Sequence, residues 1–396
     1  MTDIKMEEKM KKLSLLLAVI VLVFSAVAAC MAADYSYEDV LGWSWDEILE
    51  AAKKEGTINM ACWDSESEWI QVFDALREQY GIDVNVVIGE KNQLMNKILI
   101  EKDDPASSID IIMLAGETVN GLLGGDTLAA GTLAKMEAKD DLIEGLSKMK
   151  EGVENSENWW VPININPAGW VYNKNFISED QLPQNMDELT AFIQANPGRF
   201  GFCIPEKGGT GQAQMEEIIA ALTGGLDQYL IAEGNVVDEN LHATWSAVWD
   251  WFDANKANIA FTTGNSDSLT RLNDGELWLT TAWNSSLYKA AYINGTLGID
   301  WGFYVPEMGL AYSGDTLSVV KNTGKPAAAL FVMNWLASKD GQDQLVDKMK
   351  WVPSNLAVEA DLRLLTPEYG ARSVSWMSAC YKVQYIADFN EKVLAN

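Results

Sequence analysis

Short apolar runs alternate with helix-type segments along the first part of the chain, and this alternation limits the possible folds most. Thr57–Trp63, Ile82–Gly89 and Ile109–Gly116 each read as a buried strand. Helix-type segments precede and follow them, and the first begins at Ser44 with Glu47 three residues later, which is the pattern of a capping box. Strands that alternate with helices form a parallel sheet with helices on both faces. The sequence therefore predicts an α/β lobe.

The same alternation resumes in the second half, after an unusual stretch. Strand-type runs occur in "RFGFCIPE", in Glu276–Asn284 and in "GLAYSGDTLSVVKN", with helix-type segments such as Ala243–Asn255 between them. Between the two halves stands "NWWVPININPAGWVYN", with three tryptophans and two prolines, and no Gly/Ser linker. Proline suits an edge or crossing strand. We therefore expect this stretch to leave one sheet and enter the other, with its indoles near a cleft between two lobes.

A chain of 396 residues is long for one hydrophobic core, which supports two lobes. We expect residues 1–29 to be a signal segment. One lobe is expected to contain residues 30–165 and 298–340, and the other residues 166–297 and 341–396.

The N-terminal segment predicts export from the cytoplasm. "MKKLSLLLAVIVLVFSAVAAC" has a short basic part, an apolar run and small residues before Cys30. The run is short for a spanning helix, which needs about 20 residues. "VAAC" resembles a lipoprotein cleavage site, so we expect Cys30 to become a lipidated N-terminus that anchors the protein to the cell membrane. Cleavage near Ala33 and an uncleaved anchor are the alternatives, and all three place the bulk of the chain outside the cytoplasm.

Composition excludes several classes of function. The net charge of −28 argues against nucleic acid, because phosphate binding needs Lys and Arg. The single histidine, His242, cannot form the usual zinc sites, and no GxSxG nucleophile motif occurs. If Cys30 carries lipid, three cysteines remain, and an odd number does not make a disulfide framework. We therefore expect no catalytic residues, no bound metal and no cofactor.

A family resemblance adds to this reading. It rests on "WDEILEAAKKEGTINMACW", "SIDIIMLAGETVNGLLGGDTLA", "GWVYNKNFI", "ELTAFIQANPGRFGFCIP", "LNDGELWLTTAWNSSLYKA" and "KPAAALFVMNWLASKDGQDQL" followed by "VPSN". In this order they resemble the family-1 extracellular solute-binding proteins of ABC importers, in the cluster that binds thiamine, polyamines and ferric ion. The resemblance implies a two-lobed periplasmic-binding-protein type II fold. It also implies a monomer that closes on a small ligand and delivers it to a permease and its ATPase.

The ends of the predicted strands give the candidate ligand site. In α/β folds ligands bind beyond the carboxyl ends of parallel strands. We expect the ligand-binding residues to come from these strand ends, from the crossing stretch and from one helix start. They are Trp63, Asp64, Ser65, Gly116, Glu117, Trp170, Thr210, Gly211, Trp283, Asn284, Ser285, Tyr312 and Asp315.

Indoles and carboxylates dominate this set, and it contains no Lys or Arg. Aromatic faces beside carboxylates favour organic cations. We therefore expect a thiamine-like compound, ahead of a polyamine. A sugar remains open because indole also stacks on sugar rings, and ferric ion remains open because Tyr288 and Tyr292 lie four residues apart. A secreted glycoside hydrolase and an adhesive surface protein are the alternatives from other classes.

Overall fold

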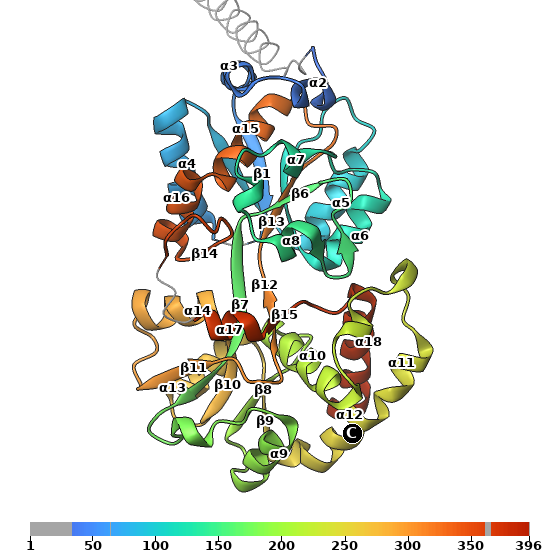
Figure 1. Cartoon of the computed structure of the whole chain (residues 1–396), viewed down its shortest axis with the longest axis vertical. Coiled ribbons are helices and arrows are strands. Elements are labelled where there is room, and N and C mark those ends of the chain that lie inside the picture. The colour runs from blue at the N-terminus through green and yellow to red at the C-terminus, as the bar shows by residue number, and fades with distance from the viewer. Residues whose placement is uncertain (1–33, 64, 361–365, 396) are drawn as a thin grey trace, which may run out of the picture.

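The computed structural model describes residues 34–63, 65–360 and 366–395, which form two lobes stacked along the long axis of the molecule (Figure 1). The predicted signal segment and Cys30 lie outside these residues, so the expected anchor is not described. None of the helices within the described residues is long and apolar enough to cross a membrane.

The upper lobe contains a five-stranded sheet in the order β2-β1-β3-β13-β6. Strand β1 pairs in parallel with β2 and β3, whereas β13 is antiparallel to β3 and β6. The elements of this lobe are α2 (Tyr37–Leu41), α3 (Trp45–Glu55), β1 (Ile58–Cys62), α4 (Glu66–Tyr80), β2 (Val84–Ile88), α5 (Lys91–Glu101), β3 (Ile111–Leu114), α6 (Gly116–Gly124), α7 (Thr132–Lys135), α8 (Glu144–Lys148), β4 (Met149–Lys150), β5 (Val153–Glu154), β6 (Trp160–Pro162), β13 (Thr316–Val319), α15 (Pro326–Ala337) and α16 (Lys339–Met349).

The lower lobe is built on a mixed sheet with the main order β15-β12-β7-β10-β8-β9, and β11 and β14 also pair with β7. Its elements are β7 (Asn164–Asn173), α9 (Met186–Ala195), β8 (Phe200–Cys203), α10 (Gly209–Thr223), α11 (Glu239–Thr244), α12 (Ser246–Asn255), β9 (Ile259–Thr262), α13 (Asn265–Asn273), β10 (Leu279–Trp283), α14 (Asn284–Tyr288), the π-helix η6 (Lys289–Ile293), β11 (Trp301–Tyr304), β12 (Leu310–Ser313), β14 (Val352–Pro353), α17 (Pro367–Arg372), β15 (Ser373–Val374) and α18 (Ala379–Phe389).

Two antiparallel crossings lie side by side between the lobes, one from β6 to β7 and the other from β12 to β13, and the chain passes to the lower lobe again between α16 and α17. Long strand β7 runs down the middle of the molecule beside β12 (Figure 1). Asn164 Nδ2 donates to Asp315 Oδ2 and the Asp315 amide donates to Asn164 Oδ1, both at 2.7 Å. The predicted crossover stretch is therefore confirmed, and reciprocal hydrogen bonds hold the two crossings together.

The structure moves several predicted boundaries. "GLAYSGDTLSVVKN" forms two strands in different sheets, because the chain crosses between lobes at Gly314 and Asp315. Strands β11 and β12 thus belong to the lower sheet, although we placed residues 298–340 with the upper lobe. Helix α16 belongs to the upper lobe, since Leu345 and Met349 join its core. The second and third exchange points therefore lie later in the chain than the sequence indicates.

The crossing indoles do not line a cleft as expected. Trp160 is buried in the upper lobe and Trp170 in the lower lobe, each with no exposed surface. The alternation of side chains along a strand directs these two rings into the cores that the strands build. Another local expectation is confirmed, because Ser44 and Glu47 form the capping box.

Candidate ligand-binding cleft

A cleft of about 560 Å³ lies between the lobes. Its upper wall consists of Trp63, Ser65, Lys91, Leu114, Ala115, Gly116, Lys150, Glu151, Asp315 and Trp351, and its lower wall of Asn166, Gly209, Gln212, Asn265, Trp283, Ser285, Ser286, Lys289, Trp376, Lys382, Val383 and Ile386. Both crossings adjoin the cleft, because Asn166 comes from β7 and Asp315 follows Gly314.

Six of the expected residues line this cleft. They are Trp63, Ser65, Gly116, Trp283, Ser285 and Asp315. Trp63 follows β1, Gly116 follows β3 and Trp283 ends β10. The carboxyl ends of these strands face the gap between lobes, which is the place that the strand-end rule indicates.

Five expected residues lie elsewhere or only beside the cleft. Trp170 is in the lower core, where its Nε1 donates to Glu217 Oε2 at 3.2 Å. Thr210, Gly211 and Asn284 are buried behind cleft residues at the starts of α10 and α14. Tyr312 lines an adjoining hollow with Lys150, Glu151 and Trp376. Asp64 and the side chain of Glu117 lie outside the described part of the structure.

Thr210 is not the N-cap residue of its helix. Helix α10 begins one residue earlier, at Gly209, and the side chain of Asn265 occupies the capping position instead. Asn265 Oδ1 accepts from the Thr210 amide at 3.2 Å and from Thr210 Oγ1 at 2.7 Å. Asn265 itself starts α13, so these bonds tie two helix starts together at the floor of the cleft.

Four lysines of the cleft were not anticipated. Lys91 and Lys150 come from the upper lobe, and Lys289 and Lys382 come from the lower lobe. Lys91 follows the short loop after β2, so the rule that ligands bind beyond the carboxyl ends of parallel strands could have found it. The other three come from the β4–β5 hairpin, η6 and α18, and the local sequence does not place these elements at the cleft.

Two of these lysines lie over indole rings. Lys91 Nζ is 4.9 Å from the ring centroid of Trp63, and Lys382 Nζ is 4.6 Å from that of Trp376. Lys382 also pairs with Glu151 across the gap at 2.6 Å, and both side chains are almost fully buried. Lys150 Nζ donates to the carbonyl oxygen of Gly314 at 3.0 Å. The lysines are thus held in place by groups of both lobes.

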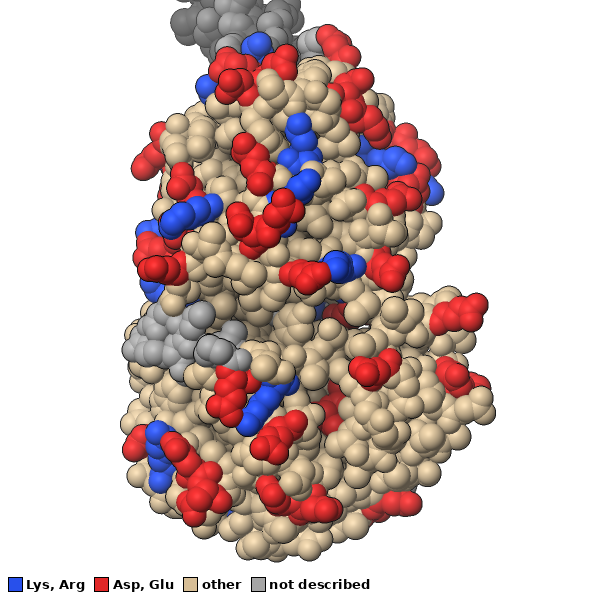
Figure 2. Space-filling view, in the orientation of Figure 1, with Lys and Arg blue, Asp and Glu red and all other residues tan. Residues whose placement is uncertain are grey.

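The described carboxylates of the cleft already have partners within the protein. Glu151 accepts from Lys382, and Asp315 accepts from Asn164. Across the gap, Lys289 lies 3.6 Å from Glu68 of α4. Among the described lining residues four lysines stand against these two carboxylates, so the cleft is basic within a very acidic protein. Figure 2 shows that acidic side chains are spread over both lobes on the visible face.

The starts of three helices also meet the cleft. Ser65 precedes α4, Ala115 precedes α6 and Gly209 begins α10. The residues that precede α4 and α6 make no side-chain capping bond, so first-turn N–H groups of these two helices remain uncapped by a preceding side chain, whereas Asn265 caps α10. Such N–H groups and the helix dipole favour an anion.

The described residues contain no group of three or more His, Cys, Asp and Glu side chains that could hold a metal ion. Tyr288 and Tyr292, which the ferric-ion alternative invoked, lie with ring centroids 4.9 Å apart. Tyr292 also packs against Trp301, which pairs with β7, so this contact is part of the lower lobe.

A family model described as "bacterial extracellular solute-binding protein" matches residues 71–370. The chain belongs to this family. The resemblance seen in the sequence is thereby confirmed for this solute-binding protein, and the family places it outside the cytoplasm. No curated protein sequence matches it.

Solved structures confirm the two-lobed fold. Iron-bound HitA from Pseudomonas aeruginosa is 19% identical with a TM-score of 0.60, over 85% of this chain and 99% of that chain. AfuA from Actinobacillus pleuropneumoniae, with fructose-6-phosphate bound, is 17% identical with a TM-score of 0.59, over 86% and 99%. The spermidine/putrescine protein PotD from Streptococcus pneumoniae is 13% identical with a TM-score of 0.64, over 86% and 99%.

AfuA is named a periplasmic binding protein, and PotD is named the substrate-binding protein of an ABC transporter. The ligands of the three proteins differ, because their names mention iron, a sugar phosphate and polyamines. At these identities the likeness establishes the fold and leaves the ligand to the residues of this cleft.

Proposed function

We propose that the cleft binds a small organic anion, that the lobes close on it, and that the protein delivers it to an ABC permease. The observation that carries this proposal is the set of four lysines, two from each lobe, in the lining of the cleft. A ligand that touches both walls then completes the charge balance of the closed form. We also propose that Cys30 holds the protein at the membrane, as its sequence context indicates.

Charge complementarity favours an anion over the cation expected from the sequence. The residues expected at the site from the sequence include no Lys or Arg, but lysines from other elements enter the cleft. The described carboxylates are engaged by Lys382 and Asn164, which leaves them poorly placed to balance a ligand cation. Lys91 and Lys382 already lie over Trp63 and Trp376, where a ligand cation would otherwise stack.

The remaining aromatic surface indicates the other end of the ligand. Trp283 and Trp351 also line the cleft, and the rings of Trp283 and Trp376 lie 6.0 Å apart. Flat indole faces bind planar or ring-shaped groups, and the starts of α4 and α6, which no preceding side chain caps, favour phosphate or carboxylate. A ring compound with one such anionic group matches both features. The organic cation is the second candidate, because the cleft contains four indoles.

A thermal-shift panel tests the ligand class. The compounds are fructose 6-phosphate, pyridoxal phosphate and citrate as anions, thiamine, spermidine and choline as cations, and maltose as a neutral sugar. A ligand at about 100 times its dissociation constant stabilises the protein by roughly 2.7 kcal/mol. We expect stabilisation by at least one anion. Stabilisation by cations alone, or by maltose alone, contradicts the proposed anion specificity.

Small-angle scattering tests closure. With a stabilising compound from the panel, the radius of gyration is expected to fall, because the lobes approach each other about Asn164–Pro167 and Ser313–Thr316. A non-stabilising compound serves as the control. An unchanged radius at saturation indicates a rigid cleft and would leave the anion specificity standing.

A further inference from the structure

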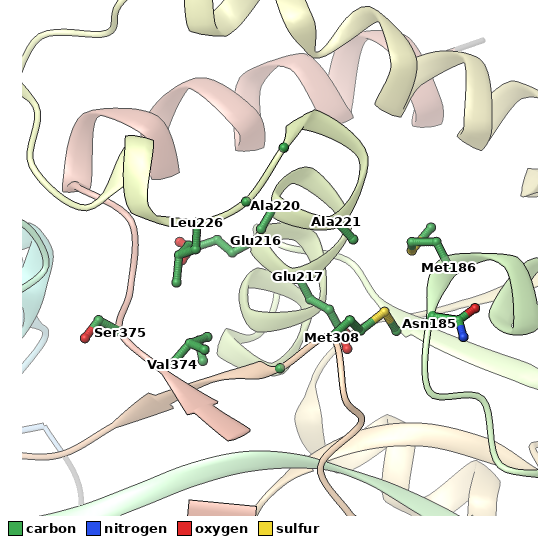
Figure 3. A pocket seen from close by; sticks show the side chains of 14 residues that line it. Asn185, Met186, Glu216, Glu217, Ala220, Ala221, Leu226, Met308, Val374 and Ser375 are labelled. Carbon is green, nitrogen blue, oxygen red and sulfur yellow. The ribbon is translucent and has the colours of Figure 1, made fainter. Parts of the chain in front are cut away.

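A second cavity of about 420 Å³ lies within the lower lobe (Figure 3). It shares no lining residue with the cleft between the lobes. Helix α10 connects the two, since its first turn lines the cleft and its later turns, from Glu216 to the glycines that follow Thr223, line this cavity. The start of α9, the loop before β12 and strand β15 form the remaining walls.

Two adjacent glutamates of α10, Glu216 and Glu217, carry the chemistry of this cavity. They are 2% and 4% exposed, and among the described lining residues there is no Lys or Arg. Glu216 accepts from the Met377 amide at 2.8 Å and from the Tyr385 hydroxyl at 3.0 Å. Burial raises the pKa of Glu216 to about 8 and that of Glu217 well above its usual range.

Glu217 lacks a partner for one of its oxygens. Its Oε2 accepts from Trp170 Nε1 at 3.2 Å, whereas no described residue forms a hydrogen bond with Oε1. A buried polar atom without a partner costs about 1–3 kcal/mol. Leucine or alanine at this position would avoid that cost, so the carboxyl group calls for an explanation beyond packing.

The rest of the lining is apolar and adaptable. Met186, Ala220, Leu226, Met308 and Val374 surround the carboxyl groups. In Figure 3 the Glu217 side chain extends from α10 toward Met308. Methionine has three rotatable bonds and adjusts to irregular shapes, so Met308 can turn aside to open a path to Glu217.

We propose that this cavity is a second binding site, for a small amine with an apolar body whose ammonium group pairs with Glu217. The ammonium donates to Oε1, and the apolar body fills the space beside Met186, Leu226 and Met308. If Glu217 holds a proton before binding, that proton passes to solvent as the ion pair forms. The site is independent of the ligand in the cleft between the lobes.

Benzylammonium is the probe, with benzyl alcohol as its uncharged analogue and benzoate as its anionic one. Binding is followed by NMR of ¹³C-methyl methionine in the full chain, because Met186 and Met308 report on this cavity. We expect benzylammonium to shift both signals and to bind at least about tenfold more tightly than benzyl alcohol. Benzoate is expected to produce no shift.

Three variants make the test specific. Glu217→Gln keeps the shape and removes the charge, and it is expected to weaken benzylammonium binding at least about tenfold. Ala220→Leu fills the cavity without altering either glutamate and is expected to abolish the shifts. Glu239→Gln, at a side chain that is 90% exposed on α11, is the matched control and is expected to bind normally.

Equal binding of benzylammonium and benzyl alcohol overturns the proposal, as does unchanged binding by Glu217→Gln. Absence of any shift at benzylammonium concentrations on the order of 10 mM also overturns it. A dissociation constant above that concentration means a binding free energy of no more than about 3 kcal/mol. Failure of the anion panel leaves this result untouched, since the two sites share no lining residue.

Discussion

Replacing Lys91 and Lys289 together by glutamine is expected to weaken binding of the anionic ligand about a hundredfold. The two lysines lie on opposite walls of the cleft, on α5 and η6. A hydrogen bond to a charged group is worth about 1.5–3 kcal/mol, so each single exchange is expected to cost about tenfold or more. Isothermal titration calorimetry with the compound identified in the panel measures the effect.

These two lysines are suitable because their loss spares the fold. Lys382 is a poor choice, since its removal leaves Glu151 buried without its partner. Lys289 is partly exposed and its contact with Glu68 is long, at 3.6 Å. Lys339→Gln is the matched control, because this lysine is 62% exposed on α16 and pairs with Asp343. The control is expected to bind as tightly as the native protein.

The sign of the change separates the two ligand classes. If the ligand is an organic cation, removal of two positive charges from the cleft is expected to tighten binding. If it is a neutral sugar, the change is expected to be small and insensitive to salt. Binding that strengthens in the double variant therefore contradicts the anion proposal and returns the cation to first place.

The sequence predicted the strand ends of the cleft because local pattern determines them. Trp63, Gly116 and Trp283 follow or end apolar strands, and parallel strands present their carboxyl ends at one edge. The position of a strand end is thus available from a short window of residues. The same reasoning located the crossover at β6 and β7, where prolines and the absence of a linker favoured a crossing strand.

The lysines of the cleft could not be predicted in this way. Lys150 lies in a two-residue strand and Lys382 in the first turn of α18, and neither position carries a local signal for a cleft. Their approach depends on how the hairpin and the C-terminal helix pack across the gap, which is tertiary information. The expectation of a cationic ligand omitted these lysines, because it considered only the charges at the strand ends.

Trp170 illustrates the opposite error. An indole in a crossing strand suggested a ligand platform, yet Trp170 packs against Phe200 and Tyr304 in the lower core. Side chains alternate between the two faces of a strand, and the sequence does not tell which face of β7 meets the helices. Aromatic residues serve both for cores and for ligand sites, so composition alone does not separate the two roles.

Replacing Gly211 by alanine is expected to destabilise the protein by about 3 kcal/mol, at the upper end of the usual cost of overpacking. A Cβ at this position would lie 1.9 Å from the carbonyl oxygen of Cys203 and 2.7 Å from its carbonyl carbon. Both contacts are with backbone at the end of β8, and Gly211 lies in the first turn of α10. Neither element can yield as a side chain would, so the helix must shift from the sheet.

Thermal unfolding without ligand measures this effect, and the midpoint is expected to fall by roughly 4 °C in a chain of this length. Gly124→Ala is the matched control, because Gly124 ends α6 and a Cβ there meets nothing within 4 Å. Its midpoint is expected to stay unchanged or rise slightly, since alanine favours a helix by up to about 1 kcal/mol over glycine.

We nominated Gly211 from the sequence as a ligand-binding residue, whereas its surroundings indicate close packing of helix on strand. A normal midpoint with reduced ligand affinity would restore the ligand-binding role, and a lowered midpoint in the absence of ligand supports the packing role.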